Sequence, residues 1–150
     1  MFLLLQLYAT VMPSISSAIG KFFQLEELED KDKCTTEVML NPDHTVTVGE
    51  TDGPVFKTVA GRWKEMADGT FKMTLTRRYE SGREKSAPTD MGEFEYEVER
   101  IFTGEMTKVG GKLAVSGVMH NMDKILGDEE VGFFNMIDTS KENIGKEDQK

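Results

Sequence analysis

Histidine and cysteine carry the most versatile chemistry near neutral pH, and this sequence contains three such residues, His44, His120 and Cys34. His120 lies in the segment VMHNMDK, near Asp123 and Asp128. A carboxylate there could orient it as a general base or join it in binding a metal ion. Catalysis needs a further partner that the spacing does not supply, so an exposed histidine at a strand end is the favoured interpretation. The same interpretation applies to His44, which lies in the turn segment PDHT.

Cys34, in the segment DKDKCTT, has no second cysteine with which to form a bridge and no resolving partner. One cysteine and two histidines are also too few for a typical zinc site. The sequence contains neither a G-x-S-x-G nucleophile elbow nor a glycine-rich phosphate loop. We therefore predict no catalytic residues, no cofactor and no metal ligands, and an enzyme is the least favoured class.

Two arginines, Arg77 and Arg100, stand in series of otherwise apolar or aromatic residues that alternate with polar ones. The series are Phe71, Met73, Leu75 and Tyr79 around Arg77, and Phe94, Tyr96, Val98 and Phe102 around Arg100. A buried charge needs a partner, so such an arginine either lies at the rim of a barrel mouth beside a carboxylate or holds an anionic ligand. The rim is the favoured alternative, and both arginines are candidate ligand-mouth residues.

A row of alternating glutamates occupies the opposite face of the second series, at Glu93, Glu95, Glu97 and Glu99. A solvated strand face is the simplest interpretation, and a surface for a basic partner is the alternative. Near the C-terminus, Phe133, Phe134 and Met136 place apolar groups on both faces of one strand. Such a strand is either covered by another element or available to a protein partner.

The chain has 150 residues and a formal net charge of −9, which predicts one domain and argues against nucleic acid as a partner. Residues 1–20 carry no charged side chain. The apolar run Phe2–Met12 is shorter than the roughly 20 residues that a membrane-spanning helix needs. We predict a targeting segment over residues 1–18, with cleavage after Ala18 and no transmembrane span. The alternative is a first helix or strand that packs on the core.

Hydrophobic periodicity divides the rest of the chain into three parts. Residues 19–36 are expected to form an amphipathic lead-in of one or two helical turns, followed by a solvated charge run. Residues 37–138 have a period of two, with turns at 41–43, 52–54, 67–69 and 110–111. Residues 139–150 are expected to form a polar tail.

The fold expected from this pattern is an all-β antiparallel meander of six to seven strands. No segment is long enough for the crossover helices of a parallel sheet. Glycines within the strands, Gly61, Gly104, Gly117 and Gly132, mark bends that curl a sheet. We therefore expect a small lipocalin-like barrel or half-barrel.

Residues 89–139, together with VTVGETDGPV and GRWKEMADGTFKMTLTRRYESG, resemble small nucleus-encoded proteins of diatoms and related red-lineage algae. One β-rich member of that group is similar to an accessory subunit at the periphery of photosystem I with its fucoxanthin–chlorophyll antenna. The resemblance implies a plastid location beside the thylakoid membrane and brings no active site with it. Plastid-targeted diatom proteins usually have Phe directly after the cleavage point, whereas Ile19 and Gly20 follow Ala18 here.

The first functional hypothesis is therefore a non-enzymatic accessory subunit that binds the protein subunits of a photosynthetic membrane complex. The alternative is a lipocalin-like carrier of a small apolar or anionic ligand, such as a pigment or fatty acid, with Arg77 or Arg100 at the mouth. If the N-terminal segment is a simple signal peptide, the location is the secretory pathway.

Overall fold

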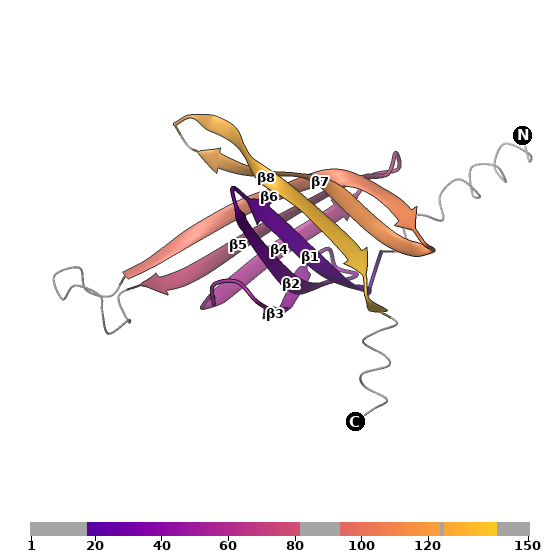
Figure 1. The fold of residues 1–150 in the computed structure, drawn as a ribbon, viewed down its shortest axis with the longest axis horizontal. Coiled ribbons are helices and arrows are strands. Elements are labelled where there is room, and N and C mark those ends of the chain that lie inside the picture. The colour runs from indigo at the N-terminus through magenta and orange to yellow at the C-terminus, as the bar shows by residue number, and fades with distance from the viewer. Residues whose placement is uncertain (1–17, 82–93, 124, 141–150) are drawn as a thin grey trace, which may run out of the picture.

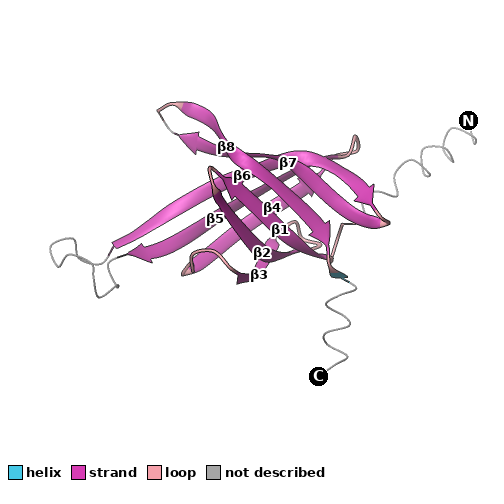
Figure 2. Cartoon of the chain, in the orientation of Figure 1, coloured by secondary structure: helices cyan, strands magenta, loops and turns pink. Residues whose placement is uncertain are grey.

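A computed structural model of the chain describes residues 18–81, 94–123 and 125–140. All named elements are β-strands (Figure 2), as the sequence pattern predicts. The described residues form eight strands in place of the expected six to seven: β1 Phe22–Glu29, β2 Asp32–Leu40, β3 Val46–Thr51, β4 Thr58–Glu65, β5 Thr70–Ser81, β6 Phe94–Val109, β7 Lys112–Asp123 and β8 Gly127–Asp138.

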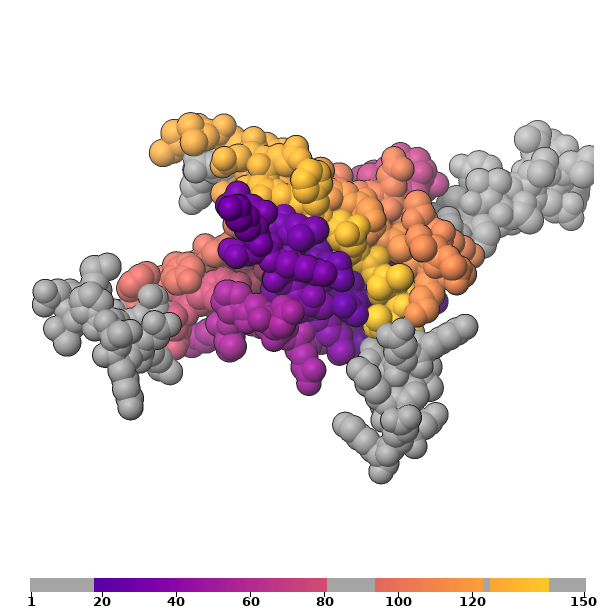
Figure 3. All heavy atoms as spheres, viewed as in Figure 1, coloured from indigo at the N-terminus to yellow at the C-terminus, as the bar shows by residue number. Residues whose placement is uncertain are grey.

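The strands form one antiparallel sheet in the order β3-β2-β1-β8-β7-β6-β5-β4, which curls into a nearly closed barrel (Figure 1). Pairing of β1 with β8 joins the first part of the chain to the last, and Figure 3 shows these two strands side by side. The outermost strands, β3 and β4, meet at a seam. There Thr45 bridges to Arg62, and the amide of Trp63 donates a 2.9 Å hydrogen bond to the His44 carbonyl.

The expected helical lead-in is wrong, because residues 22–29 form β1 and residues 32–40 form β2. In β1 the buried positions are Phe23, Leu25 and Glu27, which recur with the period of two that a strand requires. The third residue, Glu27, stands within a charge run. The sequence alone therefore suggests a solvent-exposed position for a side chain that points into the barrel. The apolar residues Phe22, Leu25 and Leu28 are three positions apart, a spacing that is also typical of one face of a helix.

Alternate side chains from all eight strands fill the interior. The fully buried residues with the largest side chains are Phe23, Phe71, Phe102, Phe134, Leu25, Leu40, Met73, Leu75, Met119, Met136, Val38 and Val115. Phe102 and Phe134 pack edge to face, with ring centroids 5.2 Å apart. This core occupies the part of the barrel toward the β4–β5 and β6–β7 turns.

Gly104 and Gly117 face each other across β6 and β7. A Cβ atom on Gly117 would lie 2.0 Å from the carbonyl oxygen of Thr103 and 2.6 Å from the Cα of Gly104. Such distances exclude any side chain, so glycine permits the close backbone approach here. The aromatic side chains of Phe71 and Phe134 flank the pair in the register, as in sheets that are curved at glycines.

Several sequence predictions fall outside the described residues: most of the targeting segment, Glu93 and most of the polar tail. Within the described part, no helix is long and apolar enough to cross a membrane.

Glu65, at the end of β4, has both carboxylate oxygens buried, and neither accepts a hydrogen bond within the described part of the chain. Burial raises the pKa of this carboxyl above its ordinary value of 4.5. The Glu65 carboxyl therefore binds its proton more tightly in the folded protein than in the unfolded chain. The resulting stabilisation is complete below about pH 4.5 and is lost as the pH rises through the folded-state pKa.

We expect Glu65→Gln to raise the free energy of unfolding by about 1 kcal/mol at pH 7, because it removes an unpaired buried charge. At pH 4, where Glu65 is largely protonated, the variant and the wild type should differ little. Thermal unfolding followed by circular dichroism at both pH values measures this. The exposed Glu105→Gln on β6 is the control and should change neither melting temperature. An equal effect of Glu65→Gln at both pH values would contradict the assignment.

Candidate functional site

One end of the barrel interior is polar and contains a cavity of about 340 Å³. It lies at the end that carries the β1–β2 turn and the β3–β4 connection. Its volume is at the lower end of the range for small-molecule sites. The lining residues are Glu27, Glu29, Asp30, Asp32, Cys34, Thr36, Thr51, Pro54, Phe56, Arg77, Tyr79, Val98 and Arg100.

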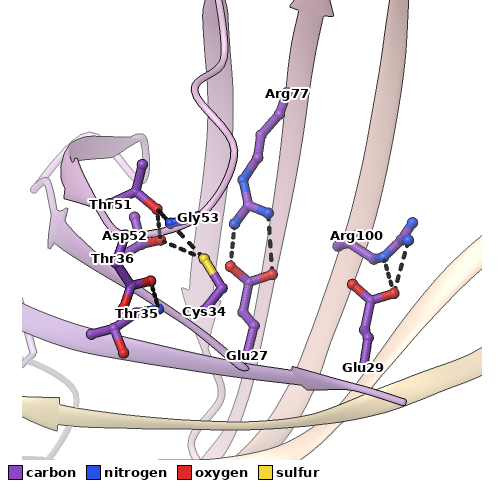
Figure 4. Close-up of polar contacts among 10 residues, drawn as sticks. All are labelled: Glu27, Glu29, Cys34, Thr35, Thr36, Thr51, Asp52, Gly53, Arg77 and Arg100. Carbon is purple, nitrogen blue, oxygen red and sulfur yellow. Dashed lines mark hydrogen bonds and ion pairs between the residues drawn. The ribbon is translucent and has the colours of Figure 1, made fainter. Parts of the chain in front are cut away.

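Arg77 of β5 and Glu27 of β1 form an ion pair across the barrel (Figure 4). The guanidinium donates two hydrogen bonds, from Nη2 to Oε1 at 2.6 Å and from Nη1 to Oε2 at 3.1 Å. Both residues are buried, with 8% and 4% of their surfaces exposed. Burial disfavours the charged guanidinium, but hydrogen bonds to Glu27 and attraction by its carboxylate outweigh this and raise the pKa of Arg77. The enclosed Nε of Arg77 donates no hydrogen bond within the described residues.

A second pair lies nearer the mouth, between Arg100 of β6 and Glu29 of β1. Arg100 donates to Oε1 of Glu29 from Nη2 at 2.9 Å and from Nε at 3.1 Å. Its side chain is less buried than that of Arg77. The two pairs lie along the same inward face of β1 because Glu27 and Glu29 are two residues apart.

Both candidate ligand-mouth residues, Arg77 and Arg100, thus line one cavity, and each has a carboxylate partner. The sequence interpretation missed these partners, because Glu27 and Glu29 belong to the charge run that was expected to be solvated. A detectable signal was present: Phe23, Leu25, Glu27 and Glu29 continue one alternating series. Arginines on apolar strand faces require inward carboxylates somewhere in the fold, and this series supplies them.

Cys34 lies on the wall of the cavity among hydroxyl groups. Its Sγ is 3.6 Å from Oγ1 of Thr36 and 3.5 Å from Oγ1 of Thr51, and the two hydroxyls are 2.9 Å apart. The backbone of Gly53 packs onto the thiol, since a Cβ atom on Gly53 would lie 2.4 Å from Sγ. The β3–β4 connection is held there by Asp52, which accepts a 2.6 Å hydrogen bond from the Thr35 amide. These polar groups are therefore largely paired with one another (Figure 4).

The other side of the cavity is aromatic. Phe56, from the β3–β4 connection, packs edge-on to Tyr79 of β5, with ring centroids 6.5 Å apart. Burial raises the pKa of the Tyr79 hydroxyl despite the opposing effect of Arg77, so the hydroxyl stays protonated at neutral pH. Tyr79 also stacks on Tyr96 of β6, which lies beyond the cavity.

The proposed acidic partner surface is largely paired within the molecule. Glu95, Glu97 and Glu99 are exposed, as a solvated strand face requires. Glu95 binds Lys57 and Arg78, and Glu97 binds Arg78. The hydrogen bond from Lys57 helps to hold the pKa of Glu95 below its usual range. Much of the row's negative charge is therefore offset by neighbouring cations.

The proposed apolar partner surface needs correction. Phe134 and Met136 are each only 1% exposed, because their side chains point into the barrel and form part of its core. Phe133 points outward and is 59% exposed. Of these three residues, Phe133 alone can contact a partner.

Neither histidine lies in the cavity lining. His120 points outward from β7, and its Nδ1 is 3.1 Å from the Asp128 carboxylate. His44 lies at the seam, where its ring packs on Trp63 and its Nδ1 is 3.2 Å from the Trp63 carbonyl oxygen. Among the described residues, no group of three or more His, Cys, Asp or Glu side chains is arranged to hold a metal ion.

A second hollow, of about 440 Å³, lies beside His44 at the outer face of β4 and β5. Its other lining residues are Arg62, Trp63, Lys64, Lys72 and Thr74. The interior cavity is the stronger candidate because its walls come from strands that are distant in the sequence and combine aromatic and polar groups.

Comparison of the chain with protein-family models, with curated proteins and with solved structures gives no match. The resemblance to diatom and red-lineage algal proteins, and the plastid location that it implies, therefore stay predictions.

We expect Arg77→Met to lower the free energy of unfolding by about 3–5 kcal/mol, because it leaves the Glu27 carboxylate buried without its partner. The double variant Glu27→Leu/Arg77→Met should recover most of this loss, since two apolar side chains replace the pair. Urea denaturation followed by Trp63 fluorescence measures both.

Arg78→Met is the matched control, because Arg78 lies next to Arg77 on β5 but faces outward with 43% of its side chain exposed. Its ion pairs are exposed to solvent, so this variant should lose far less stability than Arg77→Met. A single variant as stable as the double variant would show that Glu27 does not depend on Arg77.

Proposed function

We propose that this protein is a non-enzymatic, lipocalin-like carrier that binds a small molecule in the cavity at the open end of its barrel. The cavity itself carries the proposal: about 340 Å³ remains inside a barrel whose other end is filled by closely packed side chains. Strands distant in the sequence, including β1, β5 and β6, build its wall, so the site is supported by rigid elements of the sheet.

Because both arginines already have carboxylate partners, an apolar ligand fits the cavity better than an anionic one. An anionic ligand would have to compete with Glu27 and Glu29 for the guanidinium groups. It would also approach Asp30 and Asp32, which line the same cavity. An apolar ligand with few charged groups is therefore the better match.

Titration with the fluorescent naphthalene ketone 6-propionyl-2-(dimethylamino)naphthalene tests this function. We expect saturable binding with a blue shift in emission, because the cavity excludes water from the probe. Val98→Trp, which fills part of the cavity, should abolish that binding. Val118→Trp is the control on the outer face of β7, and it should leave the binding unchanged. Equal binding by Val98→Trp and the wild type would contradict the proposal.

Attachment to a larger complex is the second candidate function. Phe133 of β8 and Leu28 of β1 are register partners on the outside of the barrel, and they are 59% and 36% exposed. Neighbouring exposed apolar side chains favour contact with an apolar protein surface. This feature supports the hypothesis of an accessory subunit more directly than the acidic row does.

Native fractionation of membranes from the source cells in mild detergent tests attachment. The subunit hypothesis predicts co-migration with a chlorophyll-bearing complex, and Phe133→Glu should release the protein because it places a charge in the apolar contact. Asn135→Glu, also an exposed position on β8, is the control. Migration of the wild type alone, near the mass of a monomer, would contradict attachment.

A further inference from the structure

Four aromatic side chains form a continuous line from the cavity to the solvent. Phe56 contacts Tyr79, Tyr79 stacks on Tyr96 at 5.4 Å with an interplanar angle of 23°, and Tyr96 contacts Phe94 at 6.0 Å. We call these four residues the aromatic ladder. Phe56 and Tyr79 line the cavity. Phe94 and Tyr96 are 44% and 45% exposed, so the ladder leaves the cavity and continues outside it.

The β5–β6 hairpin gives the ladder this position. Tyr79 and Tyr96 are register partners on the inward face of the two strands. This pair of strands extends beyond the other described strands at the open end (Figure 1), so no described strand lies opposite its inward face there. Exposed aromatic faces next to a cavity mouth provide a stacking surface for a flat ligand.

The polar groups around the cavity are mostly paired with one another. Glu27 and Glu29 neutralise Arg77 and Arg100, and the Cys34 thiol lies between two threonine hydroxyls. The unpaired Nε of Arg77 is enclosed by protein atoms and therefore out of a ligand's reach. An anionic ligand would have to break an existing pair, and a cationic ligand would have to leave bulk water for the exposed, solvated carboxylates of Asp30 and Asp32, whereas the aromatic faces need no such exchange.

We infer that the ligand is an uncharged molecule with a flat aromatic or conjugated body, which lies along the aromatic ladder with one end in the cavity. This inference rests on the proposed function, since it specifies the ligand of the same cavity. Stacking on Tyr79 and Tyr96 provides the main contact, and the paired charges exclude ionic competitors of the same shape.

Displacement of the naphthalene ketone probe by three competitors with one ring system tests the charge preference. The competitors are 2-acetylnaphthalene, which is neutral, 2-naphthoate, which is an anion, and 2-naphthylmethylammonium, which is a cation. We expect the neutral ketone to displace the probe at concentrations at least about tenfold lower than either ion, because the anion meets the carboxylates around the cavity and either ion gives up its hydration on entering. Stronger displacement by naphthoate or by the ammonium compound would overturn the inference.

Variants of the exposed part of the ladder test the stacking. Tyr96→Ala should weaken probe binding about tenfold, and Tyr96→Phe should restore it because the ring is kept. Phe133→Ala removes an exposed ring on the outer face of the barrel and should leave probe binding unchanged. If Tyr96→Ala binds as the wild type does, the ladder does not hold the ligand.

The two proposals fail in different ways. Binding that is blocked by Val98→Trp but is indifferent to Tyr96→Ala, or strongest for an ion, overturns the ligand class and leaves the carrier function standing. Absence of saturable binding for the probe and all three competitors overturns both.

Discussion

Backbone hydrogen bonding between β1 and β8 is the constraint on which the rest of this structure depends. β1 lies between β2 and β8, so it joins the β1–β3 part of the chain to the β4–β8 meander. Without that pairing, both parts would expose unpaired strand edges and one apolar face each. With it, the sheet curls until β3 and β4 meet at the seam, and alternate side chains from eight strands share one interior.

The same pairing creates the polar end of the interior. The inward face of β1 begins with Phe23 and Leu25 and continues with Glu27 and Glu29, so closure brings two carboxylates into the barrel. Arg77 and Arg100 lie on the strands across from them. A buried ion pair contributes little net stability, because desolvation offsets most of the attraction, but it strongly disfavours arrangements that leave one member alone. These pairs therefore favour one registration of β1 relative to β5 and β6.

The division of the interior has a functional consequence. Large apolar side chains fill one end, whereas at the other end paired charges, small hydroxyl side chains and two rings of the aromatic ladder, Phe56 and Tyr79, line the cavity. A wall of this kind offers a ligand shape and aromatic contact, and both of its arginines already have carboxylate partners. The outside of the barrel is organised similarly, since Lys57 and Arg78 offset two members of the glutamate row. Exposed apolar groups such as Phe133 are then the outer features that differ most from an ordinary solvated surface.

The sequence by itself determined the fold class, most strands after residue 37, the main turns, and the inward direction of Arg77 and Arg100. Those features depend on local patterns: alternation of side chains, turn residues, and glycines where backbones approach closely. Only the tertiary structure decided that residues 22–29 form a strand, that Glu27 and Glu29 pair with the arginines, and that Phe134 and Met136 belong to the core. It also decided that Tyr79 and Tyr96 continue a ladder out of a cavity. The physical reason is that alternation along a strand shows which residues share a face of the sheet. It does not show which face becomes the interior or which residues lie across from it. A glutamate looks solvated until closure of the sheet places an arginine 50 residues away within hydrogen-bond distance.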